Sequence, residues 1–173
     1  MSYYKIENLE EYFKHYKKSI REPRKFWDRI ASENFTWYQQ WDKVIDFNMA
    51  EAEIKWFTNA KVNITKNCID RHLAKKGEKT AIIFEPNDPN EEALHISYNE
   101  LYERVARMAN VLREQGIKKG DRVCIYLPMI PELAVSVLAC ARIGAIHSVV
   151  FAGFSASAVA ARINDSECKM VIT

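Results

Sequence analysis

The residues best suited to contact a ligand form a short turn, FAGFS at positions 151–155, between an apolar run and a helical pattern. Free N–H groups at a helix start favour anions such as phosphate, and open α/β sheets bind ligands at the carboxyl ends of their strands. Gly153 would permit a close approach between backbone and ligand, because it has no side chain. The same pattern is also typical of an ordinary strand-to-helix turn, so the residues alone leave both interpretations open.

Other reactive side chains in the sequence form no catalytic or metal-binding set. Cys68 and His72 are four residues apart and would share one helix face, but a metal site needs at least one more convergent ligand. His147 lies in a strand pattern, where we expect a packed core histidine and not a general base. The apolar neighbours of Cys124 and Cys140 indicate small core residues. The sequence therefore predicts no catalytic residue and no metal ligand.

Three apolar runs near the end of the sequence, separated by two helical patterns, predict the elements that position the turn. The runs cover 122–127, 146–151 and 169–173. Strands that alternate with helices of about a dozen residues are typical of βαβ units and a parallel sheet. The expected fold is therefore α/β, with a βαβαβ parallel sheet.

The ends of these elements have chemical causes. Pro131 suits the first turn of a helix, and Gly144 can end that helix in the left-handed conformation. Ser155 is expected as the N-cap of the following helix. The run 149–151 lacks alternation, which predicts a buried parallel strand.

Upstream segments predict a short helix over 65–76 and a β-hairpin with strands at 80–85 and 93–96. Ser97 and Glu100 have the spacing of a capping box and predict a helix that runs to position 115. Its expected buried stripe consists of Leu101, Val105, Met108, Ala109 and Leu112.

Residues 1–60 read as a helical, aromatic-rich extension. An apolar stripe from Leu9 to Ile20 predicts one helix, and Pro23 predicts the start of a second. The aromatic residues that follow have no clear periodicity, and we expect them to pack against a larger body and not to form a ligand box. The predicted domains are 1–60 and 61–173, with the boundary near 58–65.

Composition excludes several classes of protein. The 173-residue chain is 48% hydrophobic, as globular proteins are, and its net charge of +2 gives no basis for a nucleic-acid or membrane partner. The N-terminus is too polar for a signal peptide, and no apolar run approaches the roughly 18 residues of a membrane span. Four cysteines without paired metal spacing fit a reducing compartment, so we expect a cytoplasmic location.

Literal runs of the sequence resemble one family. PMIPE (128–132), ACARIGA (139–145) and HSVVF-x-GFS (147–155) closely resemble the acetyl-CoA synthetases, the AMP-forming acetate–CoA ligases of the adenylate-forming superfamily. Segments WF (56–57), NCIDRHL (67–73) and SYNEL (97–101) match the same pattern. The resemblance extends from about Tyr12 to Thr173. It implies that 61–173 begins the large adenylation domain and that 1–60 lies against the main body.

The resemblance implies a two-step reaction with ATP, CoA and Mg²⁺. Acetate attacks ATP to give acetyl-adenylate and pyrophosphate, and the thiol of CoA then takes the acetyl group. The family uses a phosphate loop with a lysine, an adenine and ribose pocket, an acyl pocket and a C-terminal lid, and none of their motifs occurs here. We therefore expect the fragment alone to be inactive, with the rest of the adenylation domain and the lid missing.

One site element of the family has a counterpart in this chain. A Phe-Gly-Gly turn that contacts the nucleotide end of CoA matches Phe151, Ala152 and Gly153. The resemblance implies that Phe151 contacts the adenine face and that the backbone of 152–153 approaches the ligand. Ala152 stands where glycine is usual, which a negative backbone φ would tolerate.

Two alternatives stay open at this point. Propionate–CoA ligases share these motifs, and the acyl pocket that separates them from acetate–CoA ligases is not in the sequence. A free-standing α/β binding or interaction module would also fit the strand and helix pattern. A Rossmann dinucleotide domain would need G-x-G-x-x-G after a strand, which Gly153 alone does not supply.

Overall fold

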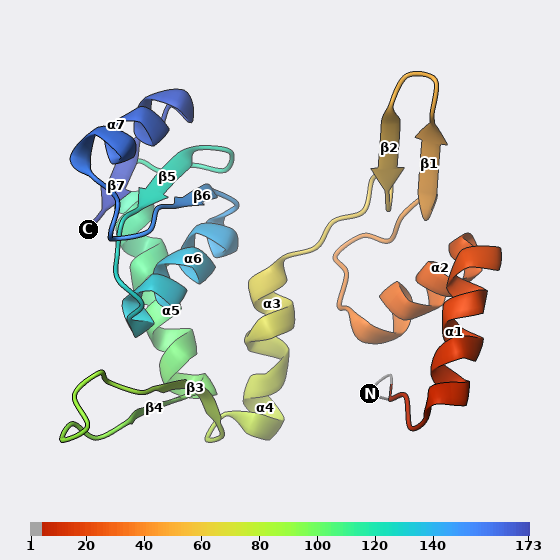
Figure 1. Cartoon of the computed structure of the whole chain (residues 1–173), viewed down its shortest axis with the longest axis horizontal. Helices are drawn as coiled ribbons and strands as arrows, with labels where there is room; N and C mark the ends of the chain where they lie inside the picture. The colour runs from red at the N-terminus through yellow and green to blue at the C-terminus, as the bar shows by residue number, and fades with distance from the viewer. Residues whose placement is uncertain (1–4) are drawn as a thin grey trace. The chain divides into compact units, whose positions relative to one another are not determined.

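The computed structural model describes residues 5–173, which form two compact units, one ending at Val62 and one beginning at Asn63 (Figure 1). The division falls within the segment 58–65, where the composition of the sequence changes. The roles assigned to the two parts, an extension and the start of an adenylation domain, remain predictions.

The first unit contains two helices and a hairpin. Helix α1 spans Leu9–Arg21 and α2 spans Pro23–Asn34, with Pro23 at the start of α2 as predicted. Strands β1 (Ile45–Asn48) and β2 (Glu53–Trp56) pair in antiparallel orientation. This hairpin was not predicted from the sequence, because the aromatic residues around it obscure the alternation by which a strand is recognised.

Aromatic rings in the first unit pack on one another. The ring centroids of Trp37 and Trp41 are 5.0 Å apart, and those of Trp41 and Phe57 are 4.9 Å apart. The indole N–H of Trp41 donates to the Asp28 carboxylate at 2.9 Å, and Phe26 is buried. Edge-to-face rings at these distances are the usual geometry of packed aromatic side chains.

The second unit begins with a broken helix. The single helix predicted over 65–76 is wrong: the segment forms α3 (Ile64–Cys68), a 3₁₀ turn η1 (Asp70–His72) and α4 (Leu73–Lys76). The backbone of Ile69 leaves the helical region at φ −121° and ψ −70°, and its side chain is fully buried. The break ends the i to i+4 relation between Cys68 and His72, so they do not share a helix face.

Strands β3 (Thr80–Phe84) and β4 (Leu94–Ser97) form the predicted antiparallel hairpin, which leads into α5 (Tyr98–Glu114). The capping box is present: the Ser97 N–H donates to the Glu100 carboxylate at 2.8 Å, and the Glu100 N–H donates to the Ser97 hydroxyl at 3.2 Å. The predicted stripe of α5 lies in the core, with four buried residues and Met108 partly buried against them.

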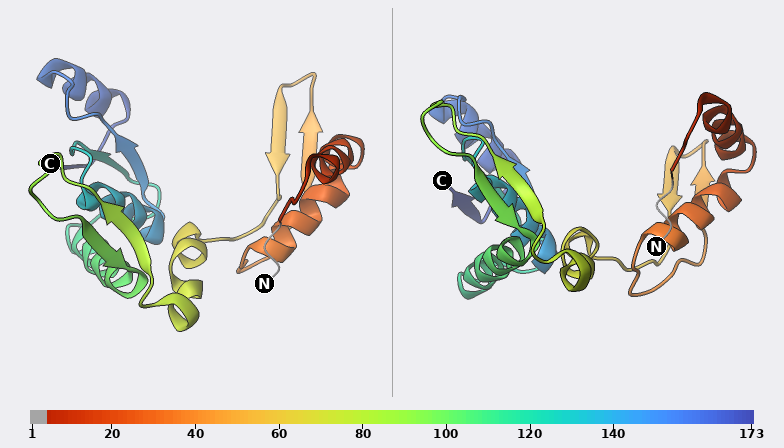
Figure 2. Two further views of the ribbon diagram at one scale, coloured as in Figure 1. Left: turned by 60° about the horizontal axis from the view of Figure 1, so that its bottom comes forward. Right: turned by 90° about the horizontal axis from the view of Figure 1, so that it is seen from below.

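Strands β5 (Arg122–Ile125), β6 (Ile146–Val149) and β7 (Met170–Ile172) form a parallel sheet in the order β6-β5-β7. Helices α6 (Pro131–Ile143) and α7 (Ala156–Asp165) connect them (Figure 2). On β5, Val123 and Ile125 join the core with α5 and α6, while Cys124 packs with Val159 of α7. The two crossover helices therefore cover opposite faces of the sheet, and the predicted α/β fold is confirmed.

Strand β6 is not the buried strand that the sequence predicted. It lies at one edge of the sheet, and Ile146, His147 and Val149 are all exposed. Phe151 is 65% exposed, whereas Val150 is only 1% exposed. His147 is therefore not the packed core histidine that the sequence predicted, because the edge strand leaves this side chain uncovered.

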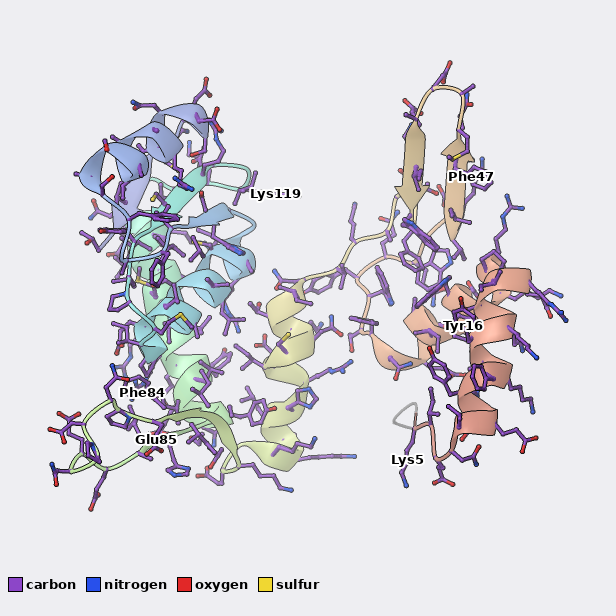
Figure 3. All side chains as sticks on the ribbon, in the orientation of Figure 1. Lys5, Tyr16, Phe47, Phe84, Glu85 and Lys119 are labelled. Atoms are coloured by element: carbon purple, nitrogen blue, oxygen red, sulfur yellow. The ribbon has the colours of Figure 1, made fainter. Side chains whose placement is uncertain are left out.

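The turn between α5 and β5 is held by one buried carboxylate. The Asp121 side chain accepts from the Lys118 N–H at 2.8 Å and pairs with the Lys169 ammonium at 2.6 Å. These contacts hold the pKa of Asp121 below its ordinary value. Lys119 lies at the exposed part of this turn (Figure 3).

Candidate functional site

The candidate turn starts where the sheet ends. The Val150 N–H donates to the carbonyl of Ile125 at 2.9 Å, which is the last backbone bond between the segment and β5. The chain then reverses, and the Phe154 N–H donates to the carbonyl of Phe151 at 3.0 Å. Positions 151–154 therefore form a β-turn at the carboxyl end of a parallel strand, as the sequence predicted.

Two exposed aromatic rings form the outer side of the turn. The rings of Phe151 and Phe154 meet edge to face, with centroids 6.0 Å apart and an interplanar angle of 87°. The guanidinium of Arg162, from α7, lies 4.5 Å from the centroid of Phe154. The Arg162 contact fixes Phe154 by a cation–π interaction, whereas most of the Phe151 surface is open to solvent.

The ring of Phe151 occupies the space beside Gly153 where a side chain would be. A Cβ atom at position 153 would lie 2.6 Å from Cε1 of the Phe151 ring. The φ of Gly153 is not positive, unlike that of Gly116, Gly120 and Gly144, so left-handed backbone is not the reason for glycine here. The glycine instead leaves room for the ring of Phe151 to fold back over the turn.

Ala152 occupies its position without backbone strain. The φ of Ala152 is not positive, so an alanine can take the place of the usual glycine without strain. Its carbonyl accepts a hydrogen bond from the hydroxyl of Tyr126 at 2.8 Å, and the carbonyl of Phe154 lies 2.9 Å from the same hydroxyl. Tyr126 was not predicted as part of the site, because the sequence shows it just as a tyrosine at the end of an apolar run.

Helix α7 begins directly after the turn. The Ser155 hydroxyl accepts from the Ala158 N–H at 3.4 Å, which confirms Ser155 as the N-cap. No acidic residue lies in the first turn of the helix. The helix therefore presents its positive end beside the turn without a side-chain carboxylate to neutralise it.

The buried cysteines are unsuited to nucleophilic chemistry. Burial raises the pKa of the Cys140 thiol to about 11 and also raises that of Cys124. Both thiols therefore stay protonated at neutral pH, and their predicted role as small core residues is confirmed.

Within residues 5–173, no group of three His, Cys, Asp or Glu side chains could hold a metal ion. No helix in that range has the length and apolar character to cross a membrane.

Comparison with protein families gives two adjoining matches. The model described as "AMP-binding enzyme" matches residues 69–173, and that described as "Acetyl-coenzyme A synthetase N-terminus" matches residues 12–68. The first match includes the sheet, the candidate turn and α7. The second includes most of α1, together with α2, the β1–β2 hairpin and α3.

Individual relatives agree with these matches. Acetyl-coenzyme A synthetases from Desulfatibacillum aliphaticivorans and Rhodobacter capsulatus are 56% and 55% identical to this chain over 164 and 168 residues. These alignments cover 94% and 96% of this chain but 25% and 26% of the relatives. The solved structure of acetoacetyl-CoA synthetase from Streptomyces lividans superimposes on 90% of this chain and 24% of its own, with a TM-score of 0.82 and 26% identity.

The chain thus spans about a quarter of the length of the curated relatives it matches. Its parallel sheet is the one expected at the start of an adenylate-forming enzyme, and the two family models match consecutive segments of the chain. The chain belongs to the AMP-binding enzyme family, and within that family it is homologous to the N-terminal region of acetyl-coenzyme A synthetases.

Proposed function

We propose that this chain forms the N-terminal part of an acetate–CoA ligase, which makes acetyl-CoA from acetate, ATP and CoA. The observation that carries the proposal is identity above 50% to acetyl-coenzyme A synthetases across almost the whole chain. In the proposed reaction, an acetate oxygen attacks the α-phosphorus of ATP and pyrophosphate leaves. The CoA sulfur then attacks the acetyl carbonyl and AMP leaves.

The proposed task of residues 151–153 is to bind the nucleotide end of CoA in the second step. Phe151 offers an exposed ring on which an adenine can stack, and the adjacent N-terminus of α7 favours the negative charge of a nucleotide. Gly153 keeps the ring of Phe151 close to the backbone. These residues take no part in adenylate formation.

Mg²⁺ belongs to the proposal as a cofactor of the longer protein and is not proposed to bind to this chain. The described residues supply no cluster of metal ligands, and the family motifs for binding ATP phosphates do not occur in the sequence. A cytoplasmic location is part of the proposal, on the basis of four cysteines that are all free thiols in the structure.

Activity of the longer protein tests the proposal. The "full-length protein" is the longer natural protein to which this chain belongs. We expect acetate-dependent exchange of pyrophosphate into ATP, and acetyl-CoA formation when CoA is added. Propionate should react more slowly than acetate at equal concentration. Absence of acetate-dependent exchange would contradict the proposal, and a preference for propionate would favour the propionate–CoA ligase alternative.

The chain on its own provides a second test. Because it lacks the motifs that handle ATP, we expect calorimetry to give an ATP dissociation constant no tighter than about 1 mM, equivalent to roughly 4 kcal/mol of binding free energy. Acetate-dependent pyrophosphate exchange should be absent. Micromolar binding of ATP would instead support an independent binding module.

A further inference from the structure

Tyr126 connects the central strand of the parallel sheet to the candidate turn. It follows β5 directly, and its N–H donates to the carbonyl of Ile172 at 2.8 Å, so its backbone is fixed to β7. Its ring is half-buried and packs with Cys124, Val150 and Val159. The hydroxyl extends beyond this apolar cluster to the carbonyl oxygens of Ala152 and Phe154.

The hydroxyl contacts both of these carbonyl oxygens at hydrogen-bond distance, 2.8 Å to Ala152 and 2.9 Å to Phe154. A tyrosine hydroxyl has a single hydrogen, so the two acceptors share it. No other side chain that the structure describes donates to either oxygen. Tyr126 therefore supplies the side-chain hydrogen bonding that holds the inner side of the turn, which is the side of the Ala152 and Phe154 carbonyls.

This attachment also determines where the N–H groups of the turn point. In a trans peptide the C=O and N–H bonds point in opposite directions. Because the Ala152 and Phe154 carbonyls are directed at Tyr126, the N–H groups of Gly153 and Ser155 are directed away from it. Within residues 5–173, neither N–H donates to a protein acceptor. The turn thus offers two unused donors on its outer side.

We propose that Tyr126 is a positioning residue for CoA, which acts by fixing the turn that presents the Phe151 ring and the N–H groups of Gly153 and Ser155. The inference rests on the proposed function of the turn and adds a residue outside it. Tyr126 touches none of the reacting atoms. Loss of its hydroxyl should therefore weaken CoA binding and leave adenylate formation unchanged.

Tyr126→Phe in the full-length protein is the test, because it removes the hydroxyl and keeps the packed ring. Loss of one hydrogen bond predicts a KM for CoA about three- to tenfold higher. Acetate-dependent pyrophosphate exchange and the KM for ATP should stay within about twofold, since the hydroxyl makes no contact in that step. Tyr102→Phe is the matched control, because it removes a tyrosine hydroxyl whose ring lies beneath Arg142 and away from the turn.

Chymotrypsin supplies a readout that does not depend on activity. Release of the turn should speed cleavage after Phe151 and Phe154 in Tyr126→Phe, but not in Tyr102→Phe. An unchanged cleavage rate would overturn the inference, as would an unchanged KM for CoA or an equal loss in both half-reactions. Failure of the unsubstituted protein to use CoA would instead contradict the proposed function, and that result is seen before any variant is compared.

Discussion

Phe151 and Gly153 act as a pair at the scale of single residues. The ring of Phe151 lies where a side chain at position 153 would be. This closeness explains why the residue is a glycine although its φ is not positive. The identity of Gly153 was visible in the sequence, but the reason for it was not. A contact between a ring and a backbone two residues away depends on the side-chain conformation, which periodicity and composition do not determine.

Replacing Phe151 by alanine tests the stacking role of the ring. Loss of a base–aromatic contact predicts a CoA dissociation constant in the full-length protein that is weaker by about 1–3 kcal/mol. Stability should change little, because the side chain is 65% exposed. The measurement is calorimetric titration with CoA, with thermal unfolding recorded in parallel.

Phe47→Ala is the matched control for this substitution, since Phe47 is 55% exposed and lies in β1 of the first unit (Figure 3). It should leave the CoA affinity unchanged. If Phe151→Ala binds CoA as the unsubstituted protein does, the ring does not contact the nucleotide.

Elements with local chemical signals were predicted well from the sequence. The Ser97–Glu100 capping box, Pro131 at the start of α6 and Gly144 at its end with φ 76° all act within a few residues of the boundary they define. The break at Ile69 was missed, because its cause is tertiary: the Ile69 side chain is buried in the core, and Asp70 pairs with Arg142 of α6. The exposed position of β6 was likewise set by the order of strands, which no local pattern encodes.

The capping box predicts a pH dependence of stability in the isolated chain. Hydrogen bonds from the Ser97 backbone and side chain hold the pKa of Glu100 below its ordinary value. A carboxyl group with a depressed folded-state pKa contributes stability above its unfolded pKa and loses that contribution as the pH falls through the folded value. Glu100→Gln should therefore lower the free energy of unfolding at pH 7, and the difference from the unsubstituted chain should shrink below about pH 4.5.

Urea unfolding at pH 7 and at pH 4 or below measures this difference. Glu103→Gln is the control on the same helix, since Glu103 is an exposed carboxylate that pairs with Arg107 at 3.4 Å and is not part of the capping box. The contradicting result is that the free energies of unfolding of Glu100→Gln and of the unsubstituted chain differ by the same amount at both pH values. That result would show that the charge of the capping carboxylate does not contribute to stability.

At the scale of the whole chain, both units leave large apolar side chains uncovered. In the second unit these include Ile146 and Val149 of β6 and Val171 of β7, which are 53%, 48% and 41% exposed. In the first unit, Leu9 and Ile20 of α1 are 68% and 60% exposed. Parallel sheets normally have both faces covered, so these surfaces favour contact with further protein.

We therefore expect the isolated chain to bind a hydrophobic dye and to self-associate as its concentration rises. Light scattering across a dilution series, with dye fluorescence on the same samples, measures both effects. Ile146→Thr combined with Val149→Thr should reduce them, because threonine keeps the β-branched shape of these strand residues. A monodisperse, dye-silent monomer with a sharp thermal transition would contradict the expectation.

The most direct test of the central claim, that the turn binds CoA, is Gly153→Val in the full-length protein. The added side chain displaces the exposed Phe151 ring, which costs little stability because the ring can move into solvent. Acetate-dependent pyrophosphate exchange and acetyl-CoA formation are compared across a CoA titration, with Ala160→Val on the exposed side of α7 as the control. The account predicts unchanged exchange and a KM for CoA about tenfold higher or more, which corresponds to roughly 1.4 kcal/mol. An equal fall of both activities in well-folded Gly153→Val protein would show that the turn is structural and that the CoA assignment is wrong.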